Sequence, residues 1–93
     1  MRLSLKEQYH ITETIHHFDP KAAIYLFGSR VDNSKKGGDI DLLVLSKKLG
    51  LIEKIRIKTR LYKLLGEQKI DLIIAQDISK PFISIALEQA LLL

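Results

Sequence analysis

Two aspartates, Asp39 and Asp41, stand at the start of an apolar run that reads Asp39-Ile-Asp-Leu-Leu-Val-Leu45. Residues i and i+2 of a strand point to the same face, with Cα atoms about 6–7 Å apart. At an effective dielectric constant of about 20, two carboxylates at that distance repel each other by ~2.5 kcal/mol. A divalent cation would remove this cost, and magnesium prefers carboxylate oxygens shared with substrate phosphates. An isolated D-x-D is more often a polar strand entry, so further residues must support a metal site.

Asp71 supplies that support, because it lies in a second run of the same kind, Lys69-Ile-Asp-Leu-Ile-Ile-Ala75. If the two runs are neighbouring strands, Asp39, Asp41 and Asp71 converge at one end of the sheet. Three carboxylates that share two magnesium ions are a recurrent arrangement for phosphoryl and nucleotidyl transfer. We therefore predict that these three aspartates are the catalytic and metal-binding residues, with two Mg²⁺ ions as cofactors.

Gly28 and Ser29 directly follow another apolar run, residues 22–27. A glycine at this point lets the backbone turn sharply and approach a ligand. A serine that opens a helical turn offers N–H groups and a hydroxyl to a phosphate, and Arg30 can add a charge-assisted contact. A strand-ending glycine followed by a simple helix cap is the alternative. We predict that Gly28, Ser29 and Arg30 bind the phosphates of a nucleotide.

The remaining elements are those that must position these residues. Ser4 and Glu7 have the capping-box spacing and predict a helix from about Leu5 to Phe18. The runs at 22–27, 39–45 and 69–75 predict three strands, separated after the first by a polar loop, 31–38. Together they predict an α/β (α+β) fold in one domain, residues 1–93, with the order α-β-β-α-β-α and a small mixed sheet flanked by helices.

Two further helices complete that order. Leu51, Ile55, Tyr62 and Leu65 share one helical face, and Gly66 suits the position after a helix end. Ser79-Lys-Pro81 offers a cap and an early-turn proline for a last helix through about Ala90. We expect the tyrosines to be core or half-buried residues. The leucines at 87 and 91–93 are expected either to close the core or to contact another subunit or a partner.

The composition limits the other classes of function. The net charge is +4, but the cations of residues 54–63 are spaced as on the solvated face of a helix. Few aromatic residues accompany them, so nucleic-acid binding is disfavoured. No apolar run approaches the ~18 residues of a membrane span, and the chain has no cysteine for a disulfide or a zinc site. We expect a protein of the cytoplasm.

The combined motif resembles a known family. Leu26-Phe-Gly-Ser-Arg30, followed by Gly37-Gly-Asp-Ile-Asp-Leu-Leu-Val44, looks like the signature of the DNA polymerase beta-like nucleotidyltransferase superfamily. More narrowly, it is similar to the minimal nucleotidyltransferases of bacteria and archaea. The likeness in element order covers Ala22 to Ala75. It implies that Gly28 and Ser29 hold the triphosphate of ATP or another NTP, and that the three aspartates hold the metal ions.

The resemblance also implies a biological setting. Minimal members of the family are commonly encoded beside a helical HEPN-domain protein and act as antitoxins, and some transfer AMP from ATP to a tyrosine of that toxin. Nine residues separate Ser29 from Asp39 here, one fewer than is typical of the motif. Two interpretations follow: an enzyme that modifies a partner protein, or a binding module of the same fold that neutralises its partner by occluding it. A homo-oligomer is a further possibility.

Overall fold

The computed structural model describes residues 1–34, 38–66 and 68–93 of the chain. The elements alternate along the sequence much as the apolar runs predict. Their bounds are α1 (Leu5–Phe18), β1 (Ala23–Phe27), the 3₁₀ turn η1 (Gly28–Val31), β2 (Ile40–Leu45), α2 (Leu51–Leu65), β3 (Ile70–Ala75), α3 (Pro81–Leu87) and β4 (Leu91–Leu92).

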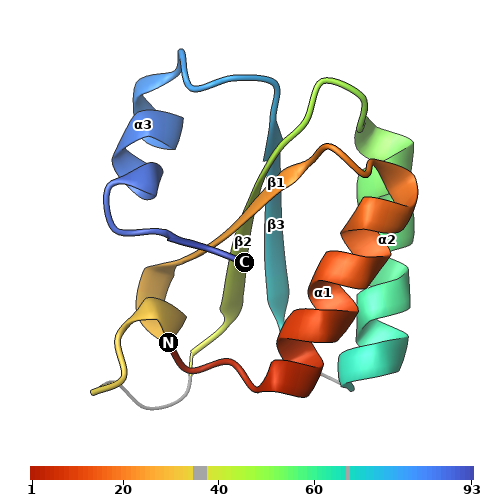
Figure 1. Cartoon of the computed structure of the whole chain (residues 1–93), viewed down its shortest axis with the longest axis vertical. Coiled ribbons are helices and arrows are strands. Elements are labelled where there is room, and N and C mark those ends of the chain that lie inside the picture. The colour runs from red at the N-terminus through yellow and green to blue at the C-terminus, as the bar shows by residue number, and fades with distance from the viewer. Residues whose placement is uncertain (35–37, 67) are drawn as a thin grey trace.

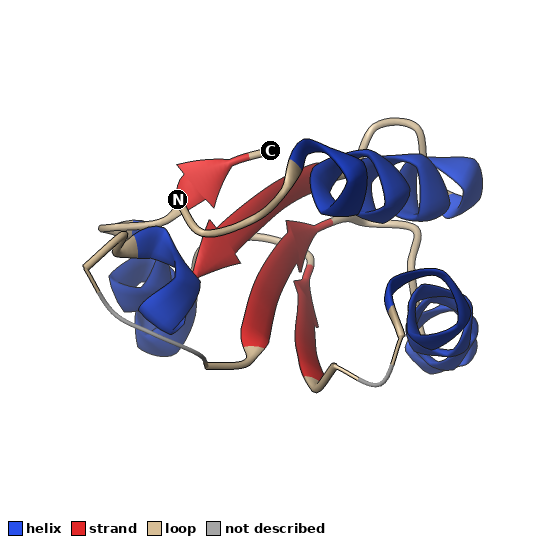
Figure 2. Cartoon of the chain, turned by 90° about the horizontal axis from the view of Figure 1, so that it is seen from below, coloured by secondary structure: helices blue, strands red, loops and turns tan. Residues whose placement is uncertain are grey.

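The described strands form one mixed sheet in the order β3-β2-β1-β4. β1 runs antiparallel to both β2 and β4, whereas β2 and β3 are parallel. The helix α2 makes the crossover between the two parallel strands, which must be joined by a long connection. Figures 1 and 2 show α1 and α2 side by side against one face of the sheet and α3 on the other side.

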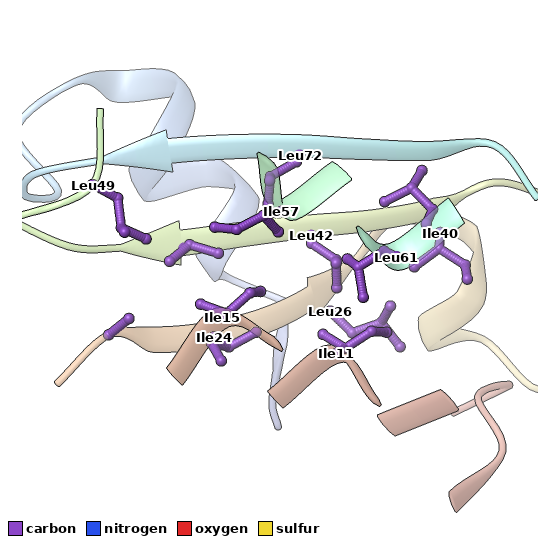
Figure 3. Close-up of a cluster of buried hydrophobic side chains, with 13 residues drawn as sticks. Ile11, Ile15, Ile24, Leu26, Ile40, Leu42, Leu49, Ile57, Leu61 and Leu72 are labelled. Carbon is purple, nitrogen blue, oxygen red and sulfur yellow. The ribbon is translucent and has the colours of Figure 1, made fainter. Parts of the chain in front are cut away.

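The main core lies between the sheet and the pair α1–α2. Alternate strand residues point toward these helices, and Figure 3 shows them packed against the inward faces of α1 and α2. Its fully buried members are Ile11 and Ile15 of α1, Ile57 and Leu61 of α2, and Ile24, Leu26, Ile40, Leu42, Val44 and Ile70 of the strands. The other strand residues, Asp41 and Asp71 among them, point to the opposite face, which carries α3.

The ends of the elements follow from local chemistry. Ser4 and Glu7 form the predicted capping box, with both reciprocal hydrogen bonds at 3.0 Å. Gly66 ends α2 with a φ of +83°, a conformation that glycine adopts without strain. Pro81 occupies the first turn of α3, as expected. The predicted serine cap is wrong, because Lys80 precedes that helix and makes no side-chain capping bond.

Three other predictions need correction. The last helix ends at Leu87 rather than Ala90, and the chain then adds the short edge strand β4. The apolar face predicted for α2 is not the buried one: Ile57 and Leu61 face the core, while Leu51 and Ile55 are 73% and 56% exposed. Tyr9 and Tyr62 also lie exposed on their helices.

The C-terminal leucines differ in their surroundings. Leu93 packs against the core and donates a backbone hydrogen bond to Ile24 O at 2.8 Å. Leu92 is 66% exposed on the edge strand β4, opposite Tyr25 of β1. The end of the chain therefore closes the core with one leucine and presents another to solvent.

Candidate active site

Asp41 and Asp71 are direct neighbours across the parallel strands β2 and β3. Their side chains point to the same face, and they are close enough to share a hydrogen bond. Partial burial raises the pKa of Asp41, and the Asp71 and Asp39 carboxylates raise it further, while Lys69 acts in the opposite direction. The sequence prediction that neighbouring strands bring carboxylates of the two runs together is confirmed for this pair.

Gly28 leaves room for the Asp41 carboxylate because it has no side chain. Its φ is +75°, and a Cβ at this position would collide with Asp41 Oδ2. The register explains the proximity, because Phe27, the last residue of β1, is paired with Asp41. The glycine is therefore needed twice: for the turn from β1 into η1, and for the close approach of the carboxylate to the backbone.

Gly38 leaves room for the Ser29 hydroxyl in the same way. Its φ is +92°, and a Cβ there would collide with the Ser29 hydroxyl. Ser29 thus lies against the backbone just before Asp39, the first aspartate of the predicted triad. Each glycine holds a chemically important side chain of the other segment, so the Gly28-Ser29 turn and the Gly38–Asp41 segment interlock.

Asp39 precedes β2, which begins at Ile40, so the two aspartates of the D-x-D motif do not both lie within the strand as predicted. The carboxylate of Asp39 lies 3.5 Å from Lys69 Nζ. The backbone sets up this pairing, because Ile40 N donates to Lys69 O beside it. Among the described residues, no group of three or more His, Cys, Asp or Glu side chains is already arranged to hold a metal ion.

The side chain of Arg30 donates its hydrogen bonds to other residues of the protein. Its guanidinium donates to Arg2 O at 2.9 Å, to Gln68 Oε1 at 3.0 Å and to Gly38 O at 3.3 Å. Arg2 in turn donates to Ser29 O at 3.1 Å and to Asp32 O at 3.0 Å. These contacts brace the Gly28-Ser29 turn from both sides, so Arg30 has the contacts of a positioning residue at this site.

The residues present fit a magnesium ion. The Asp41–Asp71 pair brings hard carboxylate oxygens close together, and Asp39, whose charge also acts on Asp41, would be a third ligand if it left Lys69. The pKa of Asp41 is raised because burial and the neighbouring carboxylates make its charged form unfavourable. A bound cation would offset that cost. Asp39, Asp41, Asp71 and Ser29 are all half-buried and Gly28 is exposed, so a ligand can reach them. One or two carboxylates together with substrate phosphates are the usual magnesium ligands.

Sequence reasoning missed two residues of this region, Lys69 and Arg2. Lys69 stands two positions before Asp71, the same spacing that separates Asp39 from Asp41, and this alternation was the available signal. Arg2 reaches Ser29 from 27 positions away in the sequence. No local pattern in the sequence could have indicated that contact.

The chain is similar to a known family of proteins. Residues 9–93 match the family model described as "Polymerase beta, Nucleotidyltransferase". The match includes both interlocked segments and all three aspartates. No curated protein matches the chain. None of the helices in the described ranges combines the length and hydropathy needed to cross a membrane.

Proposed function

The chain belongs to the polymerase beta nucleotidyltransferase family, and on that premise we propose that it transfers a nucleoside monophosphate from a magnesium-bound NTP to a hydroxyl group. The observation that carries the proposal is the contact between Asp41 and Asp71 beside the Gly28-Ser29 turn. Two carboxylates held together at an accessible position are unfavourable unless a cation or a proton is bound. A phosphate-binding turn next to them indicates which ligand brings the cation.

In the proposed mechanism, Asp39, Asp41 and Asp71 would hold the magnesium ions. Bound magnesium supplies positive charge that favours ionisation of the attacking hydroxyl and offsets the charge of the leaving group. For Asp39 to bind the metal, its carboxylate must first break the ion pair with Lys69. Lys69 is an exposed side chain and is free to turn away or toward a phosphate.

The Gly28-Ser29 turn is proposed to bind the triphosphate. Its serine hydroxyl is held against Gly38, and Arg2 fixes the carbonyl of the same residue. Donors held in place before the reaction stabilise developing charge without reorganisation. The turn would therefore hold the pyrophosphate as it leaves.

The bond changes involve only the acceptor and the nucleotide. The acceptor oxygen attacks the α-phosphorus and forms the new P–O bond, while the bond from that phosphorus to the pyrophosphate oxygen breaks. The hydroxyl proton passes to the carboxylate of Asp71, which acts as general base, a role typically contributing about 10²–10⁴-fold. Asp71 suits this role because it lies on β3, at the side of the site away from the triphosphate-binding turn.

For the substrates we propose ATP as the donor and a hydroxyl of a partner protein as the acceptor. The support is the likeness of the motif to minimal nucleotidyltransferases, which implies a HEPN-type helical protein encoded beside this one. The chain would then act in the cytoplasm as the antitoxin of a toxin–antitoxin pair.

A second candidate is a binding module that neutralises its partner without transfer. Two observations favour it: the pairing of Asp39 with Lys69, and the one-residue shortening between Ser29 and Asp39. The ion pair would weaken metal binding if it persists when a nucleotide is present, and the shorter loop would change how the phosphate and metal sites meet.

Intact-mass spectrometry distinguishes the two candidates. The protein encoded beside this chain is incubated with the chain, magnesium and each NTP in turn, and its mass is recorded. The enzyme proposal expects the mass of a nucleoside monophosphate to be added, most strongly with ATP, and no addition with Asp41→Asn. Tight binding of the two proteins with no adduct from any NTP would favour the binding module.

A further inference from the structure

The positive charge of this protein is concentrated on one helix. α2 contains five of the 15 Lys and Arg residues and one of the 11 Asp and Glu residues. The rest of the chain has ten of each, so α2 by itself accounts for the net charge of +4. The one ion pair among the described residues joins Lys69 and Asp39, so no described carboxylate pairs with the cations of α2.

The same helix exposes large apolar side chains. The exposed fractions are 73% for Leu51, 61% for Ile52, 56% for Ile55 and 41% for Tyr62. These four residues lie on the side of α2 away from Ile57 and Leu61, which pack into the core. Clustered exposed apolar residues bordered by polar ones are typical of protein contact sites.

The apolar and basic side chains form two adjacent stripes along the outer side of α2. With 100° between successive residues, Leu51, Ile52, Ile55 and Tyr62 fall in one sector, and Arg56, Arg60 and Lys63 fall in the next. A shallow hollow of about 360 Å³ lies where the stripes meet, and its lining includes Ile55, Arg56 and Thr59. We call these two stripes the α2 outer face.

We propose that the α2 outer face docks an acidic amphipathic helix of a partner protein. Such a helix would lay its apolar stripe on the leucine and isoleucines and its carboxylates on the arginines and lysine, which is a common mode of helix recognition. Opposite charges across the contact would also steer the encounter. This inference does not depend on the transfer reaction.

Charge and chemistry argue against a second copy of the chain and against DNA. A second copy of the chain, packed α2 against α2, would bring two helices of charge +4 together. DNA would match the cations but leave the exposed isoleucines without apolar contacts, and Tyr62 is the only aromatic residue of α2 for base stacking. An anionic membrane would meet the apolar stripe with cations on both sides, because Lys54 and Lys58 lie beyond its other edge, and the vesicles in the test below measure this alternative.

Docking on α2 would leave the candidate active site accessible. α2 packs on one face of the sheet (Figure 2), the face formed by Leu42 and Leu72. Asp41 and Asp71 precede these residues by one position on each strand, so they point to the opposite face. A partner could therefore be held on one side of the sheet while a nucleotide occupies the other.

The test uses the full chain and a set of defined probes. Fluorescence anisotropy measures binding of a helical peptide with leucines along one stripe and glutamates along the next. The other probes are a scrambled peptide of the same composition, a short DNA duplex, and vesicles of phosphatidylcholine with phosphatidylglycerol. The variants are Ile52→Ser with Ile55→Ser, and Arg56→Glu with Arg60→Glu. Lys21→Glu with Lys80→Glu is the control, because it makes the same charge change at exposed lysines outside α2.

The proposal expects the amphipathic peptide to bind about tenfold or more tightly than its scrambled form, and both α2 variants to lose about tenfold in affinity. The affinity of the control variant for the amphipathic peptide should stay within about twofold of that of the wild type. Circular dichroism confirms that each variant folds. Equal binding of the two peptides, stronger binding of the duplex or the vesicles, self-association through α2, or the same loss in the control would each overturn it.

Discussion

Asp41 of β2 and Asp71 of β3 face each other across a parallel strand pair, with Gly28 close enough to the first carboxylate that no side chain fits between them. Strand register brings the two acids together, and a positive-φ glycine leaves room for one of them. The contact joins residues that are 30 positions apart in the sequence. It is the structural centre of the proposed nucleotidyltransferase site.

Replacement of Gly28 by alanine should destabilise the fold more than the same change at Gly66. Both glycines have positive φ, a conformation that costs an alanine on the order of 1–3 kcal/mol. At Gly66 the added methyl group meets nothing within 4 Å, whereas at Gly28 it collides with Asp41. Urea unfolding should show an extra loss of about 1–3 kcal/mol for Gly28→Ala.

A double variant identifies the source of that extra loss. In an Asp41→Ala background the collision is absent, so Gly28→Ala should cost no more than Gly66→Ala. An undiminished cost there would mean that Gly28 acts through the backbone alone.

The free energy of unfolding should depend on pH through Asp41. Its pKa is raised in the folded state, so its favourable contribution is complete below the unfolded-state pKa and is lost as pH rises through the folded-state pKa. Without metal, Asp41→Asn should therefore stabilise the protein at neutral pH, by about 1 kcal/mol or less because the pair is partly solvated. The stabilisation by Asp41→Asn should become smaller as the pH is lowered.

Asp77→Asn is the matched control for that series. Ser79 lowers the pKa of Asp77, so this substitution should not stabilise the protein at neutral pH. Chemical denaturation of both variants between acid and neutral pH measures the two trends. A parallel response of the two variants would contradict the account of Asp41.

Asp19 and Ser46 form a polar contact at the other end of the sheet. Ser46 Oγ donates to Asp19 Oδ2 at 2.5 Å and accepts from Lys48 N and Leu49 N at 3.1 Å. Both side chains are buried, so Ser46→Ala should cost about 1–3 kcal/mol. The bond lowers the pKa of Asp19, so the stabilisation it provides should be lost as pH falls through that pKa.

Thermal unfolding of Ser46→Ala and of the wild type at neutral and acid pH tests this contact. The difference between them should be largest at neutral pH. Ser84→Ala, at an exposed serine of α3, should leave the melting temperature almost unchanged. A pH-independent difference for Ser46→Ala would assign its effect to packing instead.

The C-terminal leucines should differ in their contribution to stability. Deletion of residues 91–93 removes the pairing of β4 with β1 and the packing of Leu93 on the core, and should lower the free energy of unfolding by about 1–3 kcal/mol. Leu92→Ser changes an exposed side chain and should have little effect. Differential scanning fluorimetry compares them; a harmless deletion would show that Leu93 is not a core residue.

The sequence predicts the elements best where strong local signals agree. The capping box at Ser4 and Glu7 places α1 at Leu5–Phe18, as observed, and the apolar runs locate β1, β2 and β3 to within one residue. Of the predicted triad, the contact between Asp41 and Asp71 follows from strand adjacency. The roles of the site residues in binding and catalysis stay predictions.

What could not be predicted depends on contacts between distant residues. α2 has apolar residues around much of its circumference, so periodicity alone does not decide whether Ile55 or Ile57 faces the sheet. β4 is two residues long and exists only because β1 offers it a free edge. The pairing of Lys69 with Asp39 depends on the register of β2 and β3, because the matching spacing of the two runs does not by itself decide which residues face each other.

The most direct test of the site is calorimetric titration of the protein with ATP in the presence of magnesium. We expect a saturable heat for the wild type and for Asp77→Asn, none when magnesium is omitted, and none for Asp39→Asn with Asp41→Asn. Circular dichroism establishes that the double variant is folded. Equal heats from the wild type and the folded double variant would contradict a nucleotide site built on these aspartates.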